Sequence, residues 1–197
     1  PKLPKIYFNR WTFFDGIVEL SDKSRPFYEF GVWYGITFKY LIKKFKQGFG
    51  FDTFEGFTSI DENADPNDVN KSHFSDTSYE LISESLKLLD TIRPVNKIPR
   101  FELIKGDILK TLPAYINDRS WMTCAMLILD TDLYKPTKIA LETVLNIMPK
   151  GGVIVFDEYN YQNFPGETQA IREVLSINGL RVKKPFYESC TAYAVIE

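Results

Sequence analysis

The sequence has little cysteine, only one histidine and no long apolar run. Its two cysteines, Cys124 and Cys190, are isolated, with no CxxC pair and no metal-like spacing. This argues against a disulfide scaffold or a zinc module, so we expect reduced thiols and a cytoplasmic location. No apolar stretch approaches the roughly 18 residues that a membrane-spanning helix needs. We therefore expect no membrane partner.

Neither acidic nor basic residues are in large excess. The net charge is −2, and the only dense basic stretch, Lys43 to Lys46, falls in a segment of helical period. A solvated helix face explains that stretch, so nucleic acid is not an expected partner. Aromatic residues are plentiful, with 16 Phe, 11 Tyr and 3 Trp. They are expected to fill a core and to line grooves of a single domain spanning residues 1–197.

Short apolar runs alternate with segments of helical period along the chain. The runs cover residues 27–31, 48–52, 101–105, 125–130 and 151–158. Nearly continuous apolar strands alternating with helices are typical of a parallel sheet covered on both faces. The pattern predicts a Rossmann-like α/β fold with a mostly parallel seven-stranded sheet. Residues 180–188 and 191–197 are expected to form an antiparallel strand pair at the C-terminal end.

Polar residues and glycine stand where the apolar runs end. They are Gly31, Asp52, Asp107, Asp130, and Asp157 with Glu158. A single acid after a strand is often only a helix cap. The carboxyl ends of parallel strands share one edge of the sheet, where ligands bind. We therefore expect these residues to converge on one site.

The segment EFGVWYG, from Glu29 to Gly35, falls at the first strand–helix turn. Gly31 permits a tight turn, and Gly35 lets a helix N-terminus approach a ligand. Asp52 follows Glu29 by 23 positions, near the spacing of a ribose-binding acid in dinucleotide-binding folds. An adenosine-bearing ligand is the functional interpretation. A capped turn with a surface acid is the alternative.

The acids after the two later strands suggest a metal. Asp130, Asp157 and Glu158 would repel one another unless something positive compensates, and the nearest basic residue in sequence is Lys135. Oxygen ligands of this kind suit Mg²⁺. Asp132 would then be a carboxylate near the metal that can take a proton. The alternative is a pair of capping acids beside a solvated pair.

The order of these motifs makes the sequence similar to a known family. It resembles the class I S-adenosylmethionine-dependent O-methyltransferases of the macrocin/mycinamicin/novobiocin sugar type, over roughly residues 26–175. The carrying motifs are ExGVWxG at 29–35, DTFEG at 52–56, a relaxed GxIxxTLP at 106–113, LxLDxDLYxxT at 127–137 and GGxxxxDEY at 151–159. The DxDLY and DEY motifs are the most specific.

The resemblance implies a role for each matching position. Glu29 and Gly31 would lie by the methionine part of S-adenosyl-L-methionine, and Asp52 would bind its ribose. Gly35 would also contact the cofactor, at the helix N-terminus. Thr53 and Phe54 would flank the adenine, with Asp107 near the adenine amino group. Asp130, Asp157 and Glu158 would bind Mg²⁺, with Asp130 also beside the cofactor. Asp130 and Asp132 would be the catalytic residues, Asp132 as general base.

Two departures from related enzymes affect these assignments. Glu158 stands where many members have aspartate, which shifts the expected metal geometry. Leu133 stands where the metal-dependent catechol O-methyltransferase has a basic lysine. The acceptor implied is a hydroxyl of a sugar, glycoside or glycan, and a homo-oligomer is a possible state. The alternatives are an NAD-dependent oxidoreductase, which would need a GxGxxG turn, and a non-catalytic nucleotide-binding module.

Three further segments have an open interpretation. Residues 58–78 are polar and aperiodic, which favours either an acceptor lid or a plain surface loop. Trp11, Phe14, Ile17 and Val18 form a helical stripe that either packs on the sheet or walls the acceptor pocket. Glu167 either caps the helix that follows the second acidic motif, which is the favoured interpretation, or contacts the substrate.

Overall fold

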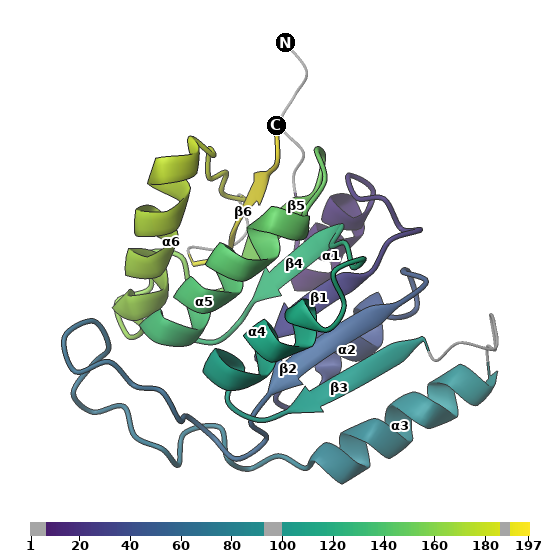
Figure 1. The fold of residues 1–197 in the computed structure, drawn as a ribbon, viewed down its shortest axis with the longest axis horizontal. Coiled ribbons are helices and arrows are strands. Elements are labelled where there is room, and N and C mark those ends of the chain that lie inside the picture. The colour runs from purple at the N-terminus through teal and green to yellow at the C-terminus, as the bar shows by residue number, and fades with distance from the viewer. Residues whose placement is uncertain (1–6, 93–99, 186–189) are drawn as a thin grey trace.

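The structure is a computed structural model, and it describes residues 7–92, 100–185 and 190–197. One sheet lies at its centre, with the strand order β3-β2-β1-β4-β5-β6 (Figure 1). Its strands are β1 (Phe27–Phe30), β2 (Gly48–Asp52), β3 (Phe101–Lys105), β4 (Met126–Leu129), β5 (Val153–Phe156) and β6 (Ala192–Val195). All neighbours pair in parallel except β5 and β6, which are antiparallel. The predicted Rossmann-like sheet is confirmed.

The expectation of seven strands is not met in the described residues, which form six. The stretch 180–185 contributes a single bridge, between Lys183 and Tyr193. Pro185 has no backbone N–H with which to extend that ladder, which explains why the pairing stops there. The rest of the expected strand, residues 186–188, lies outside the described residues.

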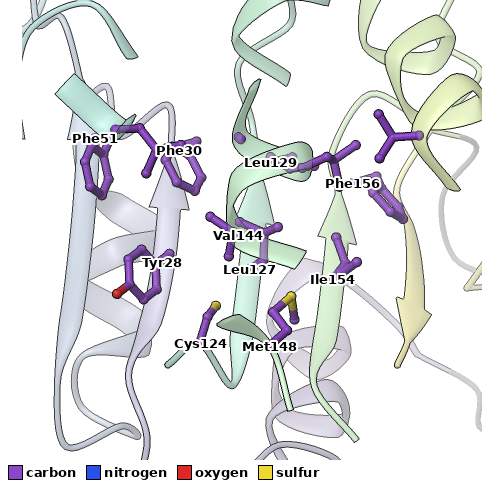
Figure 2. Packing of buried hydrophobic residues seen from close by; sticks show 14 of the residues in the cluster. Tyr28, Phe30, Phe51, Cys124, Leu127, Leu129, Val144, Met148, Ile154 and Phe156 are labelled. Atoms are coloured by element: carbon purple, nitrogen blue, oxygen red, sulfur yellow. The ribbon is translucent and has the colours of Figure 1, made fainter. Parts of the chain in front are cut away.

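Helices cover both faces of the sheet, as the alternating pattern predicted. One face carries α1 (Arg10–Val18), α2 (Ile36–Leu41) and α3 (Tyr79–Ile92). The other carries α4 (Ile108–Asn117), α5 (Tyr134–Val144) with the short 3₁₀ turn η1 (Leu145–Ile147), and α6 (Pro165–Asn178). Because side chains alternate along a strand, the strands contribute to both cores. The exception is β2, which adds Phe49 and Phe51 to the second face only and has Gly48 and Gly50 on the other. Figure 2 shows part of the core on the second face, whose cluster includes Tyr28 and Phe30 of β1, Leu127 and Leu129 of β4, and Val144 of α5.

Cys124 is buried, Cys190 is partly exposed, and both are free thiols. Among the described residues, no helix is long and apolar enough to cross a membrane. The cytoplasmic location stays a prediction.

The direction in which successive strands are added to the sheet reverses between β1 and β4, which are adjacent at its centre. After β1 the chain builds β2 and β3 on one side, and after β3 it crosses to build β4 and β5 on the other. In open α/β sheets, ligands bind at this switch point, beyond the carboxyl ends of the strands. The irregular segment between β2 and α3 loops beyond that same end in Figure 1.

Candidate active site

A cavity of about 560 Å³ opens beyond the carboxyl ends of the central strands. It is lined by most of the predicted site residues: Gly31, Asp52, Thr53, Asp107, Asp130, Asp132, Asp157 and Glu158. The sequence prediction that these positions converge is therefore confirmed. Glu29, Gly35 and Phe54 are placed elsewhere.

Gly31 sets the path of the chain where β1 ends. Its φ is +85°, a conformation that residues with a Cβ rarely adopt, and a Cβ there would lie 1.7 Å from the carbonyl oxygen of Asp130. Glycine is thus required for the β1 turn to pass against the end of β4. The next two amides, of Val32 and Trp33, donate to Asp52 Oδ2 at 2.6 and 2.8 Å.

Asp52 consequently organises two turns as well as facing the cavity. Its second oxygen, Oδ1, accepts the amide of Phe54 at 2.7 Å. A carboxylate offers about four acceptor positions, so capacity for a ribose hydroxyl remains. The two interpretations of Asp52, as a turn-capping acid and as a ligand-binding acid, are compatible.

Phe54 does not point into the cavity. Its φ of 54° turns the ring back onto Tyr79 of α3, with the ring centroids 5.3 Å apart, and leaves it 4% exposed. The expectation that Phe54 flanks an adenine does not fit this placement. Two other rings line the cavity instead: Phe57, which directly precedes residues 58–78, and Phe74, which lies within them. Thr53 also lines it, although its hydroxyl donates to the carbonyl of Gly56 at 2.6 Å.

Gly35 and Glu29 support the site from behind. Gly35 precedes α2 with φ +69° and is buried, where a Cβ would lie 2.9 Å from Ile82 Cγ2. Its role is close packing, which differs from the predicted approach to a ligand. Glu29 is 1% exposed, and its Oε2 has no hydrogen-bond partner in the described part of the chain. Burial raises the pKa of Glu29 well above its ordinary value, although the positive charge of Arg10 lowers it in part.

Asp107 has two partners at the end of β3. Its Oδ1 caps α4 by accepting the amide of Leu109 at 3.0 Å, and its Oδ2 accepts the hydroxyl of Ser59 at 2.9 Å. The helix cap and the cavity-lining position therefore belong to the same carboxylate.

The main residue that the sequence interpretation missed is Arg10. Its guanidinium bridges the ends of β4 and β5, donating to Asp157 Oδ1 at 2.5 Å and to Asp130 Oδ2 at 3.3 Å. Desolvation disfavours the charge on Arg10, but Asp157 and Asp130 more than compensate, so its pKa lies above the ordinary value. The positive charge that the acids require thus comes from far away in the sequence, and not from Lys135.

Arg10 reaches the site because α1 begins there. Asn9 and Thr12 form a capping box that fixes the first turn, and Phe13, Phe14, Ile17 and Val18 are buried. Both interpretations of the N-terminal stripe hold in part. Phe14, Ile17 and Val18 pack on the sheet, whereas Trp11 is 37% exposed and lines the cavity.

Asp132 occupies a strained turn directly after β4. Its φ is +62°, and the amide of Leu133 donates across it to the carbonyl of Thr131 at 2.7 Å. Strain of this kind in a non-glycine residue often marks a functional position. Asp132 is only 7% exposed, and desolvation, followed by the charges of Glu158 and Asp157, raises its pKa well above the ordinary value.

The chain becomes helical sooner after Asp132 than Pro136 suggested. The residue before a proline is disfavoured in helical conformation, yet α5 begins at Tyr134, two positions before Pro136. Proline is tolerated within the first turn of a helix, where its missing N–H has no helical partner to lose. The turn that brings Asp132 to the cavity is therefore complete by Leu133, the residue before α5.

Glu167 does not cap its own helix, as the sequence had suggested. It is fully buried, and its Oε1 accepts the amide of Glu158 at 3.1 Å. Burial, followed by the charge of Asp132, raises its pKa well above the ordinary value. Glu167 thus joins the acidic cluster from α6, and its spacing in the sequence gave no signal of this.

The arrangement of the acids does not fit the predicted Mg²⁺ site. Two of the three expected ligands, Asp130 and Asp157, hold the Arg10 guanidinium. In the described residues, no group of three or more His, Cys, Asp and Glu side chains is placed to hold a metal ion. The close approach of Asp130 and Asp157 is thus explained by an ion pair.

Residues 58–78 are anchored at both ends. Near the first end, Lys135 pairs with Asp61 at 3.2 Å, and Asp65 Oδ1 accepts the amide of Tyr134 at 2.9 Å. At the other end, Asp76 accepts the Trp33 indole N–H at 3.0 Å and the Tyr34 hydroxyl at 2.5 Å. The stretch between the anchors has no helix or strand.

Asp65 supplies the N-terminal cap that α5 lacks locally, because Leu133 has no capping side chain. Replacing Asp65 by Ala should therefore destabilise the fold by about 1–2 kcal/mol, lowering Tm by about 2–8 °C. Thermal denaturation followed by circular dichroism measures this. The exposed Asp68→Ala variant is the control. Equal Tm values for the two variants would contradict the cap.

The fold and the site together define a Rossmann-like α/β protein with a ligand-sized cavity at the switch point of its sheet. The sheet is six-stranded and doubly wound. One cavity beyond it is lined by the glycine turn after β1, the acid at the end of β2 and the acidic turn after β4. The profile of the macrocin O-methyltransferase (TylF) family matches residues 24–185. The chain belongs to this family and is an S-adenosylmethionine-dependent O-methyltransferase. Membership removes the oxidoreductase and the non-catalytic module as alternatives.

Solved structures with the same fold include two proteins described as methyltransferases. The calicheamicin methyltransferase CalS11 is 24% identical, with a TM-score of 0.81 over 95% of this chain and 80% of that chain. Its apo form, described as a TDP-rhamnose 3′-O-methyltransferase, gives 23% identity and a TM-score of 0.69 over 95% and 81%. The O-methyltransferase NovP gives 18% identity and a TM-score of 0.72 over 95% and 79%. No curated protein sequence matches the chain significantly.

Proposed function

We propose that the protein transfers the methyl group of S-adenosylmethionine to a hydroxyl of a sugar or glycoside, with Asp132 as the general base. The observation that carries this proposal is that one cavity contains both the turn after β1 and the buried carboxylate of Asp132. Donor and acceptor must meet in one water-poor space for a direct transfer. The cavity has room for the donor beside the turn after β1 and for the acceptor beside Asp132.

The donor half would be bound at the ends of β1, β2 and β3. Gly31 gives the cofactor close access to the backbone, Asp52 has an acceptor position for a ribose hydroxyl, and Asp107 lies across the same cavity. The sulfonium is positively charged, and the surrounding carboxylates favour a cation at this position.

The acceptor half would lie under an aromatic rim. Partly exposed rings of Trp11, Trp33, Tyr34, Phe74 and Phe164 line the cavity. Apolar walls with a few placed polar groups are typical of small-molecule sites, and flat rings suit the apolar faces of a sugar. The TDP-rhamnose named for the apo CalS11 structure is an acceptor of this class.

In the proposed reaction, the acceptor oxygen attacks the methyl carbon as the carbon–sulfur bond breaks. The hydroxyl proton passes to the Asp132 carboxylate, and neutral S-adenosylhomocysteine leaves. The raised pKa of Asp132 makes it a stronger base than an exposed aspartate. No step is assigned to Mg²⁺, because Asp130 and Asp157 hold Arg10. The homo-oligomeric state stays a prediction.

Methyl transfer can be tested with isotopically labelled S-adenosylmethionine. The protein would be incubated with a pool of nucleotide-linked sugars and glycosides, and the products read by mass spectrometry. Label on a sugar hydroxyl is the expected result. Label confined to a non-sugar acceptor from a parallel pool of phenols would overturn the acceptor class.

The ribose assignment predicts a loss of cofactor affinity when Asp52 is replaced by Ala. The hydroxyls would lose a charged acceptor, and the Val32 and Trp33 amides would lose their partner. We expect S-adenosylhomocysteine to bind more weakly by roughly 1.5–3 kcal/mol, about 10- to 150-fold. Calorimetric titration measures this, with Asp68→Ala as the control. An unchanged Kd would mean that the ribose lies elsewhere.

A further inference from the structure

The acidic end of the cavity has its own fixed cation. The Arg10 guanidinium contacts one oxygen of Asp130, one oxygen of Asp157 and the hydroxyl of Thr37, the last at 3.3 Å. It thus connects the ends of two neighbouring strands to the start of α2. It also lies over the ring of Phe14, 5.4 Å from the centroid, which limits its freedom.

We propose that Arg10 is the resident counter-cation of Asp130 and Asp157, at the position where the family resemblance implies Mg²⁺, and that removing its guanidinium creates a divalent-cation site. The consequence for catalysis, that transfer needs no divalent cation, rests on the proposed function. The consequence for metal binding does not.

A guanidinium and Mg²⁺ compete for the same oxygens. Mg²⁺ requires oxygens at about 2.0–2.1 Å in near-octahedral geometry. The Arg10 nitrogens lie 2.5 and 3.3 Å from the Asp157 and Asp130 oxygens, so they fill the positions from which those oxygens would face a metal. An ion between the two aspartates would have to displace Arg10 and leave its charge without these partners.

Displacing Arg10 is costly because its helix is fixed. It is the first residue of α1, behind the Asn9–Thr12 capping box. The next turns bury Phe13 and Ile17 completely. The side chain is 29% exposed, so its charge would gain only part of its hydration by moving away. A charge paired in a partly dry site is hard to replace without a partner.

Removing the guanidinium alone reverses the preference. Asp130 and Asp157 would then face each other with Asp132 and Glu158 in the same cavity and without the nearest positive charge. Crowded carboxylates either take up protons or bind a cation. With Arg10 in place, no three of the described acidic side chains converge on one ion, so these carboxylates have to reorient once the guanidinium is gone. Oxygen ligands in this number are then suited to Mg²⁺ and Mn²⁺.

The test is a titration of the full-length, cofactor-free protein with Mn²⁺, read by electron paramagnetic resonance of the free ion. Arg10→Ala should gain one saturable site, with Mn²⁺ bound at least about tenfold more tightly than by the wild type. Mg²⁺ should displace it. Arg10→Lys should gain no such site, because the charge is kept. Arg25→Ala, which removes a partly exposed arginine paired with Asp22, is the matched control.

The location of the new site is tested by a second substitution. Arg10→Ala combined with Asp157→Asn should lose the gained Mn²⁺ site. One tight site in the wild type that disappears in Asp157→Asn would overturn the proposal, as would an Arg10→Ala protein that is folded and gains none. If Arg10→Ala does not fold, Arg10→Gln, which keeps the stem and removes the charge, decides in its place.

The activity arm separates this inference from the proposed function. With any acceptor that is methylated, wild-type turnover should be unchanged by EDTA, whereas Arg10→Ala should be silenced by EDTA and partly restored by Mg²⁺. EDTA-sensitive wild-type turnover would overturn the inference and leave methyl transfer intact. Absence of transfer to every acceptor would overturn the proposed function, and the Mn²⁺ titration would still decide the role of Arg10.

Discussion

The Asp132→Asn protein is expected to lose about two to four orders of magnitude in kcat, the usual contribution of a positioned general base. The acceptor hydroxyl would still lie beside the side chain, but an amide does not take its proton. Asparagine is the right replacement because it tolerates the left-handed backbone found at Asp132, where φ is +62°. The turn after β4 should therefore survive, and S-adenosylhomocysteine affinity should be nearly unchanged.

The pH dependence gives this prediction a second measurement. Desolvation raises the pKa of Asp132, and the charges of Glu158 and Asp157 raise it further, so the base is protonated at low pH. Wild-type kcat/KM should rise as pH increases through that pKa, and this limb should vanish in Asp132→Asn. Single-turnover assays with labelled donor measure both, with the exposed Asp68→Asn as the control. Wild-type rates in Asp132→Asn would assign the base to another group.

Replacing Gly31 by Ala is expected to cost about 3 kcal/mol or more of folding free energy, lowering Tm by about 6–12 °C. The φ of +85° strains any residue with a Cβ, and the added carbon would lie 1.7 Å from the Asp130 carbonyl oxygen. The chain must therefore separate β1 from β4 at the point where the cofactor is expected. Cofactor affinity should fall with stability.

Gly151 provides a matched control for this substitution. Its φ of +83° is almost the same, but a Cβ there would meet nothing within 4 Å. Gly151→Ala should thus cost only the backbone strain, roughly 1 kcal/mol. The difference between the two variants in calorimetric unfolding isolates the clash. Equal losses would show that the contact between Gly31 and Asp130 relaxes without cost.

The sheet and the site edge could be predicted because their signals are local. Each of these strands is a short, mostly apolar run, and Asp52, Asp107, Asp130 and Asp157 stand at the end of such a run or within two residues of it. Parallel strands bring their ends together whatever the connecting helices contain. In the described residues, the departure in the sheet is that the pairing does not extend past the Lys183–Tyr193 bridge to Pro185, which lacks a backbone donor.

The rest depended on packing between distant segments. Arg10 precedes Asp130 by 120 positions, so nothing in the spacing placed the two together. The ring of Phe54 faces α3 because its backbone is left-handed, a conformation that neighbouring residue types did not signal. Glu167 lies on α6 and enters the cluster only because the start of that helix packs against the end of β5.

The two anchors of residues 58–78 have a consequence for how acceptor preference can change. Asp65 is fixed to α5 and Asp76 to the turn after β1, so residues 66–75 begin and end at points held by the scaffold. We expect such a stretch to tolerate replacement as a unit, because its two ends are held by the rest of the fold. A relative's loop of different length and chemistry could be grafted between these anchors without moving Asp132 or the cofactor turn, and acceptor range could diversify while the catalytic parts stay constant.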